Sequence, residues 1–297
     1  MSHACLTPII KTSNNVFLKL EFLHVGRSHK ARAAVGILNR AEASGDLVRN
    51  GGATIIEKTG GNLGIALAIE GISRGYNVEL VVGLLYSQKK RRLLRKLGAK
   101  LIGITELKAG LTPKSIINNR IIDDKFSQKK YVYLDQFTDQ GSYQGHLDTL
   151  APELYSQLID NGVSTTKTIN LIVGAGTGAS AAAVFNYLTK MQLKVNLHLV
   201  QPAGCSYRDD VFISHVIEGI AVGGIPPFLD LNLVTSYIDI SNAEAIKGQN
   251  VLLRNFGLFA GISSGANYMA IQKYLAANKS SQEEIIVSLL YDRGEDY

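Results

Sequence analysis

Short apolar runs alternate with longer segments of helical periodicity along most of this sequence, and this alternation restricts the fold more than any other feature. The predicted strands are residues 16–20, 54–57, 78–83, 101–104, 131–134, 169–173, 195–200 and 285–290, and the predicted helices are residues 33–43, 64–74, 88–97, 152–159 and 178–191. Repeated strand–helix–strand units place parallel strands side by side with helices on both faces of the sheet. The pattern therefore predicts a doubly wound, mostly parallel α/β protein.

The chain is long enough for two such units. Its 297 residues are about twice the roughly 150 residues of a typical domain, and the alternation starts again after a polar segment at 137–144. We therefore expect an N-terminal α/β domain at residues 1–136 and a C-terminal α/β domain at residues 137–297. In open α/β sheets ligands bind beyond the carboxyl ends of the strands, so the segments that follow strands are the candidates for a binding site.

Composition and charge exclude several classes of protein. Hydrophobic residues make up 46% and charged residues 19% of the chain, which rules out a disordered protein. The longest weakly polar stretch, 171–185, has three glycines and is shorter than the roughly 20 residues that span a bilayer. We see no secretory signal pattern at the N-terminus. With only Cys5 and Cys205, no disulfide framework is possible, so we expect a soluble, cytoplasmic protein.

Nucleic acid and metal are not expected as partners. The net charge of +6 is mild, and much of it lies in the basic run 89–97. Leucines recur in that run at helical spacing, which favours a solvated helix face over a nucleic-acid site. The histidines His24, His198 and His215 have no metal-ligand spacing with the cysteines, so we expect no metal site.

A glycine-rich segment after the apolar run 169–173 is the strongest local signal for a ligand. Its residues are Gly174, Ala175, Gly176, Thr177 and Gly178. Glycines let backbone N–H groups approach an anion closely, and the following helix adds the positive end of its dipole. The spacing is neither that of a dinucleotide-binding fingerprint nor that of a P-loop. The segment suits a phosphate, although a tight turn without a ligand has the same pattern.

Three further segments gain meaning only from their context. Segments 58–64 and 261–267 both precede predicted helices, and each could bind an anion or simply cap its helix. Lys30, within 27–32, would by itself be read as a solvated surface lysine.

Taken in order, these segments resemble the fold-type II pyridoxal-phosphate enzymes, specifically the cysteine synthase and cystathionine β-synthase family. The resemblance runs from Thr7 to the C-terminus. The motifs that carry it are Thr7-Pro8, Ser28-His29-Lys30-Ala31-Arg32, Thr59 to Gly64, Gln136-Phe137, the glycine loop, Gly219 to Pro226, Gly261 to Ala266, and Asp292 with Gly294 and Glu295. The family resemblance implies two α/β lobes with the cofactor in the cleft between them.

The resemblance also implies a role for individual residues. Lys30 would form a Schiff base with pyridoxal 5′-phosphate and later act as the general base. Asn62 would bond the ring oxygen, and Ser263 the pyridine nitrogen. The phosphate would be held by Gly174, Ala175, Gly176, Thr177 and Gly178. The residues expected to bind the substrate are Thr59, Gly60, Gly61, Asn62, Leu63, Gln136 and Gly219.

The activity implied by the resemblance is β-replacement on a serine- or cysteine-type amino acid through an α-aminoacrylate, with a second nucleophile adding to the β-carbon. Two alternatives stay open: a β-eliminating lyase, such as a serine or threonine dehydratase or a desulfhydrase, and a degenerate non-catalytic binding protein. The family also implies a homodimer, amino-acid biosynthesis, and no nucleic-acid or membrane partner.

Three departures from the family pattern lie at or near the expected substrate site. Gly60 stands where the family has serine, Leu63 where it has threonine, and Ala221 where it has glycine. Gly60 would leave room beside the substrate, Leu63 would form an apolar wall, and Ala221 would narrow the site. These changes predict a specialised donor or nucleophile, or low activity.

Overall fold

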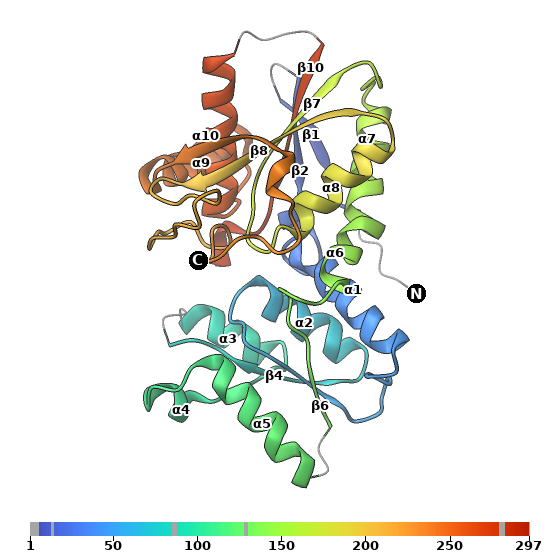
Figure 1. Ribbon diagram of the computed structural model, residues 1–297, viewed down its shortest axis with the longest axis vertical. Coiled ribbons are helices and arrows are strands. Elements are labelled where there is room, and N and C mark those ends of the chain that lie inside the picture. The colour runs from blue at the N-terminus through green and yellow to red at the C-terminus, as the bar shows by residue number, and fades with distance from the viewer. Residues whose placement is uncertain (1–5, 13–14, 85–87, 128–129, 279–282, 297) are drawn as a thin grey trace. The chain divides into compact units, whose positions relative to one another are not determined.

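The computed structural model describes residues 6–12, 15–84, 88–127, 130–278 and 283–296, and their strands form two separate sheets (Figure 1). The contacts between residues divide the chain into two compact units. The large unit comprises residues 1–24 and 146–295, and the small unit comprises residues 25–145 and 296–297.

The sheet of the large unit has six strands in the order β1-β2-β10-β7-β8-β9. Their bounds are Ile9–Lys11 (β1), Val16–Leu20 (β2), Thr168–Gly174 (β7), Lys194–Pro202 (β8), Val234–Ile240 (β9) and Glu284–Leu290 (β10). All neighbouring strands are parallel except β1, which is antiparallel to β2. Strand β7 is mostly apolar and almost wholly buried, as expected for a parallel strand with helices on both faces.

Helices cover both faces of this sheet. They are α7 (Ala151–Asp160), α8 (Ala179–Lys190), α9 (Asn242–Phe256) and α10 (Ile262–Ala277). In Figure 1, α9 and α10 lie on one side of the sheet and α7 and α8 on the other. The core beneath α10 contains Ile172, Ile271 and Leu290. A π-helical turn, His146–Leu150, precedes α7, and short 3₁₀ turns occur at Glu21–Leu23, Leu231–Leu233 and Gly294–Asp296.

The sheet of the small unit has four parallel strands in the order β5-β4-β3-β6. The strands are Thr54–Glu57 (β3), Asn77–Val81 (β4), Lys100–Ile102 (β5) and Tyr131–Tyr133 (β6). The helices of this unit are Lys30–Ala43 (α1), Asn62–Ser73 (α2), Gln88–Lys96 (α3), Ile104–Lys108 (α4), Pro113–Ser127 (α5) and Gly141–Gly145 (α6). One apolar cluster joins the sheet to α1, α2 and α3. A second cluster joins it to α4 and α5, so this sheet is also covered on both faces.

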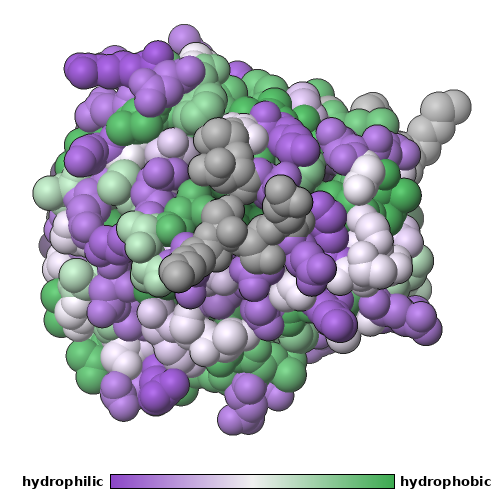
Figure 2. Space-filling view, turned by 90° about the horizontal axis from the view of Figure 1, so that it is seen from above, coloured by the Kyte–Doolittle hydropathy of each residue, from purple (hydrophilic) through white to green (hydrophobic). Residues whose placement is uncertain are grey.

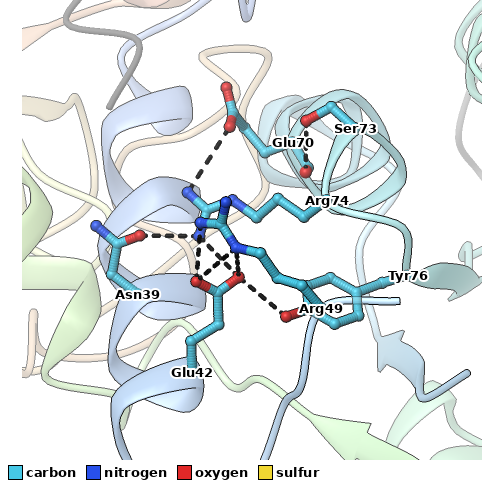
Figure 3. A network of polar contacts seen from close by, with 7 residues as sticks. All are labelled: Asn39, Glu42, Arg49, Glu70, Ser73, Arg74 and Tyr76. Atoms are coloured by element: carbon cyan, nitrogen blue, oxygen red, sulfur yellow. Dashed lines mark hydrogen bonds and ion pairs between the residues drawn. The ribbon is translucent and has the colours of Figure 1, made fainter. Parts of the chain in front are cut away.

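A polar network ties helix α1 to the end of helix α2 (Figure 3). Glu42 of α1 accepts hydrogen bonds from Arg49 Nη2 at 3.0 Å, Tyr76 Oη at 2.9 Å and Arg74 Nη1 at 3.2 Å. Burial alone would raise the pKa of Glu42, but these hydrogen bonds and the charge of Arg74 hold it below its ordinary value. Because α1 and α2 both begin at residues of the predicted site, the network fixes the two helices that carry them.

The two compact units divide the chain differently from the expected boundaries of 1–136 and 137–297. The first 24 residues belong to the large unit because β2 pairs in parallel with β10, the dark blue and red strands of Figure 1. Residues 137–145 belong to the small unit, where α6 packs on α1. This packing is close: a Cβ at Gly36 would lie 2.1 Å from the carbonyl oxygen of Gly141.

The surface mixes polar and apolar side chains. On the face shown in Figure 2, hydrophilic residues are interspersed with smaller apolar areas, which is ordinary for a protein surface. Across the described parts of the chain, no helix is long and apolar enough to cross a membrane. Cys205 is buried and not disulfide-bonded, whereas Cys5 lies outside the described residues.

Candidate active site

Each sheet has one point at which the order of its strands reverses, and three of the predicted site segments lie at the ends of strands there: 59–63 after β3, Gln136 after β6 and the glycine loop after β7. In the small unit the chain passes from β3 to β4 and β5 on one side, then returns to β6 on the other. In the large unit it passes from β7 to β8 and β9, then returns to β10 on the opposite side. Ligands bind beyond the carboxyl ends of the strands at such points.

Lys30 is the first residue of helix α1 and is partly buried. Its backbone N–H donates to Ser28 Oγ at 3.3 Å, which holds the start of the helix. Burial lowers the pKa of Lys30 to about 8, because a low-dielectric surrounding disfavours the ammonium form. A useful fraction of the amine is therefore neutral near pH 8, as both nucleophilic attack and proton abstraction require.

The segment after β3 and the first two residues of α2 hold five of the predicted substrate-binding residues. Thr59 and Gly60 are buried, Gly61 is the N-cap of α2, and Asn62 is its first residue. The N-terminus of this 12-residue helix favours a negatively charged group. We expected Leu63 to form an apolar wall of the substrate site. Instead, Leu63 is 2% exposed and belongs to the apolar core of the small unit.

The position of Leu63 on its helix explains this correction. Leu63 and Leu67 are four residues apart, so they lie on the same side of α2, and both belong to the apolar core of the small unit. A threonine there would place its hydroxyl in the core. The substitution therefore changes the packing of α2, and the structure does not place this side chain at a substrate surface.

A cluster around Asp135 joins the segments that follow β3 and β6, and no sequence motif indicated it. Asp135 Oδ1 accepts from the backbone N–H of Phe137 at 3.0 Å. Its Oδ2 accepts from Tyr133 Oη at 3.0 Å and lies 3.5 Å from Lys58 Nζ. Gln136 thus lies in a short turn, which is closed by the hydrogen bond from the N–H of Phe137 to the carboxylate of Asp135.

Glu57, the last residue of β3, is a buried carboxyl group beside this cluster. Its Oε1 accepts from the backbone N–H of Lys58 at 2.8 Å, whereas no donor among the described residues reaches its Oε2. Burial, and to a lesser extent the charge of Asp135, raises the pKa of Glu57 to about 8. Glu57 therefore carries its proton at neutral pH.

We expect Glu57→Gln to remove a pH-dependent loss of stability. Between the ordinary glutamate pKa of 4.5 and about 8, the folded chain binds one more proton at this site than the unfolded chain. Stability therefore falls as pH rises through that window. The glutamine amide of the variant stays neutral throughout, so the variant should gain on the order of 1 kcal/mol or more over wild type by pH 8.5.

The measurement is urea unfolding of both proteins from pH 4.5 to 8.5, followed by circular dichroism. Glu106→Gln is the matched control, because Glu106 is partly exposed and pairs with Arg120 at the surface. An unchanged difference between Glu57→Gln and wild type across this range would contradict the assignment.

The glycine loop follows β7 and leads into α8, as the sequence predicts. A Cβ at Gly176 would lie 2.4 Å from the carbonyl oxygen of Gly219, so only glycine fits this approach. Gly178 has φ of +81° and is the N-cap of α8. Among the residues that the structure describes, no acceptor takes the N–H groups of Gly176 and Thr177. These donors at a helix N-terminus fit a phosphate.

The other predicted residues of the large unit lie on two separate segments. Ser263 is the second residue of α10 and is buried. Gly219 is exposed and has φ of +90°. Ala221 is buried with φ of +46°, a left-handed conformation that glycine adopts more readily.

Comparison with known proteins gives one consistent result. The family described as "Pyridoxal-phosphate dependent enzyme" matches residues 3–292. Cysteine synthase A of Escherichia coli K12 is 32% identical, over 98% of this chain and 90% of that protein. Among solved structures, O-ureido-L-serine synthase has a TM-score of 0.84 at 28% identity, over 98% of this chain and 90% of its own. A hydrogen sulfide-producing enzyme from Fusobacterium nucleatum has a TM-score of 0.83 at 28% identity, over 98% of this chain and 94% of its own.

Proposed function

Because the chain belongs to the family of pyridoxal-phosphate-dependent enzymes, we propose that it catalyses β-replacement on a serine- or cysteine-type amino acid. When bound, pyridoxal phosphate supplies an electron sink that makes the α-proton of an amino acid removable. The observation that carries the proposal is Lys30, a partly buried lysine with a lowered pKa at the start of α1.

Lys30 would perform two tasks in turn. Its neutral amine would hold the cofactor covalently until an amino-acid substrate takes that place and frees the amine. The freed amine then accepts the α-proton, for which a pKa near the working pH is favourable. The ammonium that results can later return a proton to the α-carbon of the product.

The large unit would hold the cofactor through two groups. The N–H groups of Gly176 and Thr177, together with the N-terminus of α8, receive the phosphate. The Ser263 hydroxyl would meet the ring nitrogen. A hydroxyl does not hold a proton there as a carboxylate would, which favours prompt loss of the β-substituent.

The small unit would receive the carboxylate of the substrate. Backbone N–H groups at the start of α2, with the side chains of Thr59, Asn62 and Gln136, suit this anion. Asp135 and Lys58 would keep Gln136 in place beside the segment that follows β3. Gly60 supplies no hydroxyl, so a donor with a bulkier polar substituent has room there.

The second candidate is a β-eliminating lyase. A hydrogen sulfide-producing enzyme is among the structural neighbours of this chain, and elimination shares its first steps with β-replacement. The two activities differ in whether the second half-reaction needs an added nucleophile.

The test is a matrix of purified protein with candidate donors, each with and without sulfide, cysteine thiol or hydroxyurea. Mass spectrometry measures the new amino acid, and a coupled assay measures keto acid. β-Replacement predicts a nucleophile-dependent amino acid formed faster than keto acid. Keto acid released at the same rate without any nucleophile would establish the lyase. A yellow protein that converts no donor would support the degenerate binding protein.

We also propose that the enzyme forms a homodimer and works in the cytoplasm. The family resemblance and the low cysteine content support these proposals. Light scattering of the holoenzyme should give twice the 32.2 kDa mass of one chain, and a single-chain mass would contradict the dimer.

A further inference from the structure

Two buried tyrosines contact successive carbonyl groups of the glycine loop. Tyr291 follows β10, and its hydroxyl donates to the carbonyl oxygen of Gly174 at 2.8 Å. Tyr207 lies in the segment after β8, and its hydroxyl donates to the carbonyl oxygen of Ala175 at 2.6 Å. Since β10 and β8 are the two neighbours of β7, each neighbouring strand sends one tyrosine to the loop that follows β7.

Tyr207 also connects the loop to a second segment. Its hydroxyl accepts a hydrogen bond from the backbone N–H of Ala221 at 3.0 Å, and the same N–H reaches the carbonyl oxygen of Ala175 at 2.9 Å. Gly219, two residues earlier, is the residue whose carbonyl oxygen excludes a side chain at Gly176. The left-handed conformation of Ala221 is thus held by hydrogen bonds to the loop.

Both tyrosine hydroxyls keep their protons and can therefore always donate a hydrogen bond. Tyr207 is 0% and Tyr291 is 4% exposed. Burial raises the pKa of each phenol well above its usual range, so neither loses its proton at physiological pH. The ring of Tyr207 packs edge-on against Phe212, with 6.0 Å between the ring centroids.

The geometry of the peptide bond links these contacts to phosphate binding. In a planar trans peptide the C=O of one residue and the N–H of the next point in opposite directions. A donor that fixes the carbonyl of Ala175 therefore turns the N–H of Gly176 to the opposite side, and a donor that fixes the carbonyl of Gly174 does the same for the N–H of Ala175. Without such contacts the glycines of the loop would sample many backbone conformations, and ordering them would weaken binding.

We propose that Tyr207 and Tyr291 are positioning residues that prearrange the N–H groups of the glycine loop for the phosphate of the cofactor. The inference rests on the proposed role of this loop in holding that phosphate. Neither tyrosine touches the phosphate; each acts through a carbonyl on the far side of the peptide planes.

The test compares Tyr207→Phe and Tyr291→Phe with wild type in the full chain. Dissociation constants are measured by absorbance and fluorescence titration for pyridoxal phosphate and for pyridoxal, which lacks the phosphate. Each variant removes the tyrosine donor from a buried carbonyl of the loop, and in Tyr207→Phe the carbonyl of Ala175 then keeps only the N–H of Ala221 among the described residues. We therefore expect about tenfold weaker binding of pyridoxal phosphate. Pyridoxal binding should change by less than about twofold.

Tyr268→Phe is the matched control. Tyr268 is also buried in the large unit, and its ring packs against Phe256 at 5.9 Å between centroids rather than on the loop. This variant should bind both ligands like wild type. Because Tyr207 is fully buried, Tyr291→Phe carries the test by itself if Tyr207→Phe does not fold.

Three results would overturn the proposal, and they are distinguishable. If Tyr291→Phe and any folded Tyr207→Phe bind pyridoxal phosphate like wild type, the tyrosines do not position the loop. If pyridoxal and pyridoxal phosphate weaken equally, the tyrosines act on something other than the phosphate. If wild type binds both ligands equally well, the loop does not hold the phosphate, and the proposed role of the loop fails as well.

Discussion

Lys30→Ala is expected to lower kcat for β-replacement by at least about a thousandfold, since the lysine would serve as both the covalent anchor and the general base. The side chain is partly buried, and its pKa is lowered to about 8, which suits both tasks. Lys30→Arg should be equally inactive, because a guanidinium stays protonated and cannot take the α-proton. Initial rates with the best donor and nucleophile provide the measurement.

Two controls make this result specific to Lys30. Lys190→Ala removes an exposed lysine at the end of α8 and should leave kcat unchanged. Circular dichroism of Lys30→Ala should match wild type, which shows that the loss is not unfolding. Retention of a tenth or more of wild-type kcat by Lys30→Ala would contradict the assigned role.

The largest effect on stability is expected at Glu153, which forms an ion pair with the buried Lys19. Lys19 is 0% exposed, and its ammonium also donates to the carbonyl oxygen of Thr7 at 2.6 Å and to Gln157 Oε1 at 2.7 Å. Glu153→Ala takes away a carboxylate that pairs with this buried charge. We expect the free energy of unfolding to fall by about 3–5 kcal/mol, as measured by urea unfolding.

A double variant separates the buried charge from the packing. Lys19→Met with Glu153→Leu replaces both charges by apolar groups, and such replacements are often neutral or stabilising. It should therefore recover most of the loss. Glu106→Ala breaks the partly exposed pair with Arg120 and should cost less than about 1 kcal/mol. Equal losses in Glu153→Ala and the double variant would show that packing, rather than charge, stabilises this region.

The sequence predicted the parts of the fold that depend on local pattern. The doubly wound α/β class is confirmed, because buried parallel strands such as β7 are mostly apolar and alternate with segments of helical periodicity. Strand β9 escaped prediction since it is an edge strand whose residues are mostly half-exposed. The place of β2 beside β10 also escaped, because that pairing joins segments at opposite ends of the chain and leaves no local pattern.

The same distinction applies to the candidate site. Family motifs led to pyridoxal phosphate as the cofactor, which the family match confirms. The roles of Lys30, Ser263 and the glycine loop remain predictions that the structure supports in each unit separately. Asp135, Tyr207 and Tyr291 escaped notice because their partners follow different strands. Glu57 did offer a signal, as a carboxyl group closing an apolar strand is rare without a special environment.

The most direct test of the proposed mechanism is to find the lysine that carries the cofactor. Sodium borohydride reduces the C=N double bond between pyridoxal phosphate and its lysine to a stable single bond. Peptide mass spectrometry then locates the modified residue. We predict that the modification lies on Lys30 in nearly all labelled protein. Modification of a different lysine, such as Lys58, would contradict the assignment of Lys30 and the mechanism built on it.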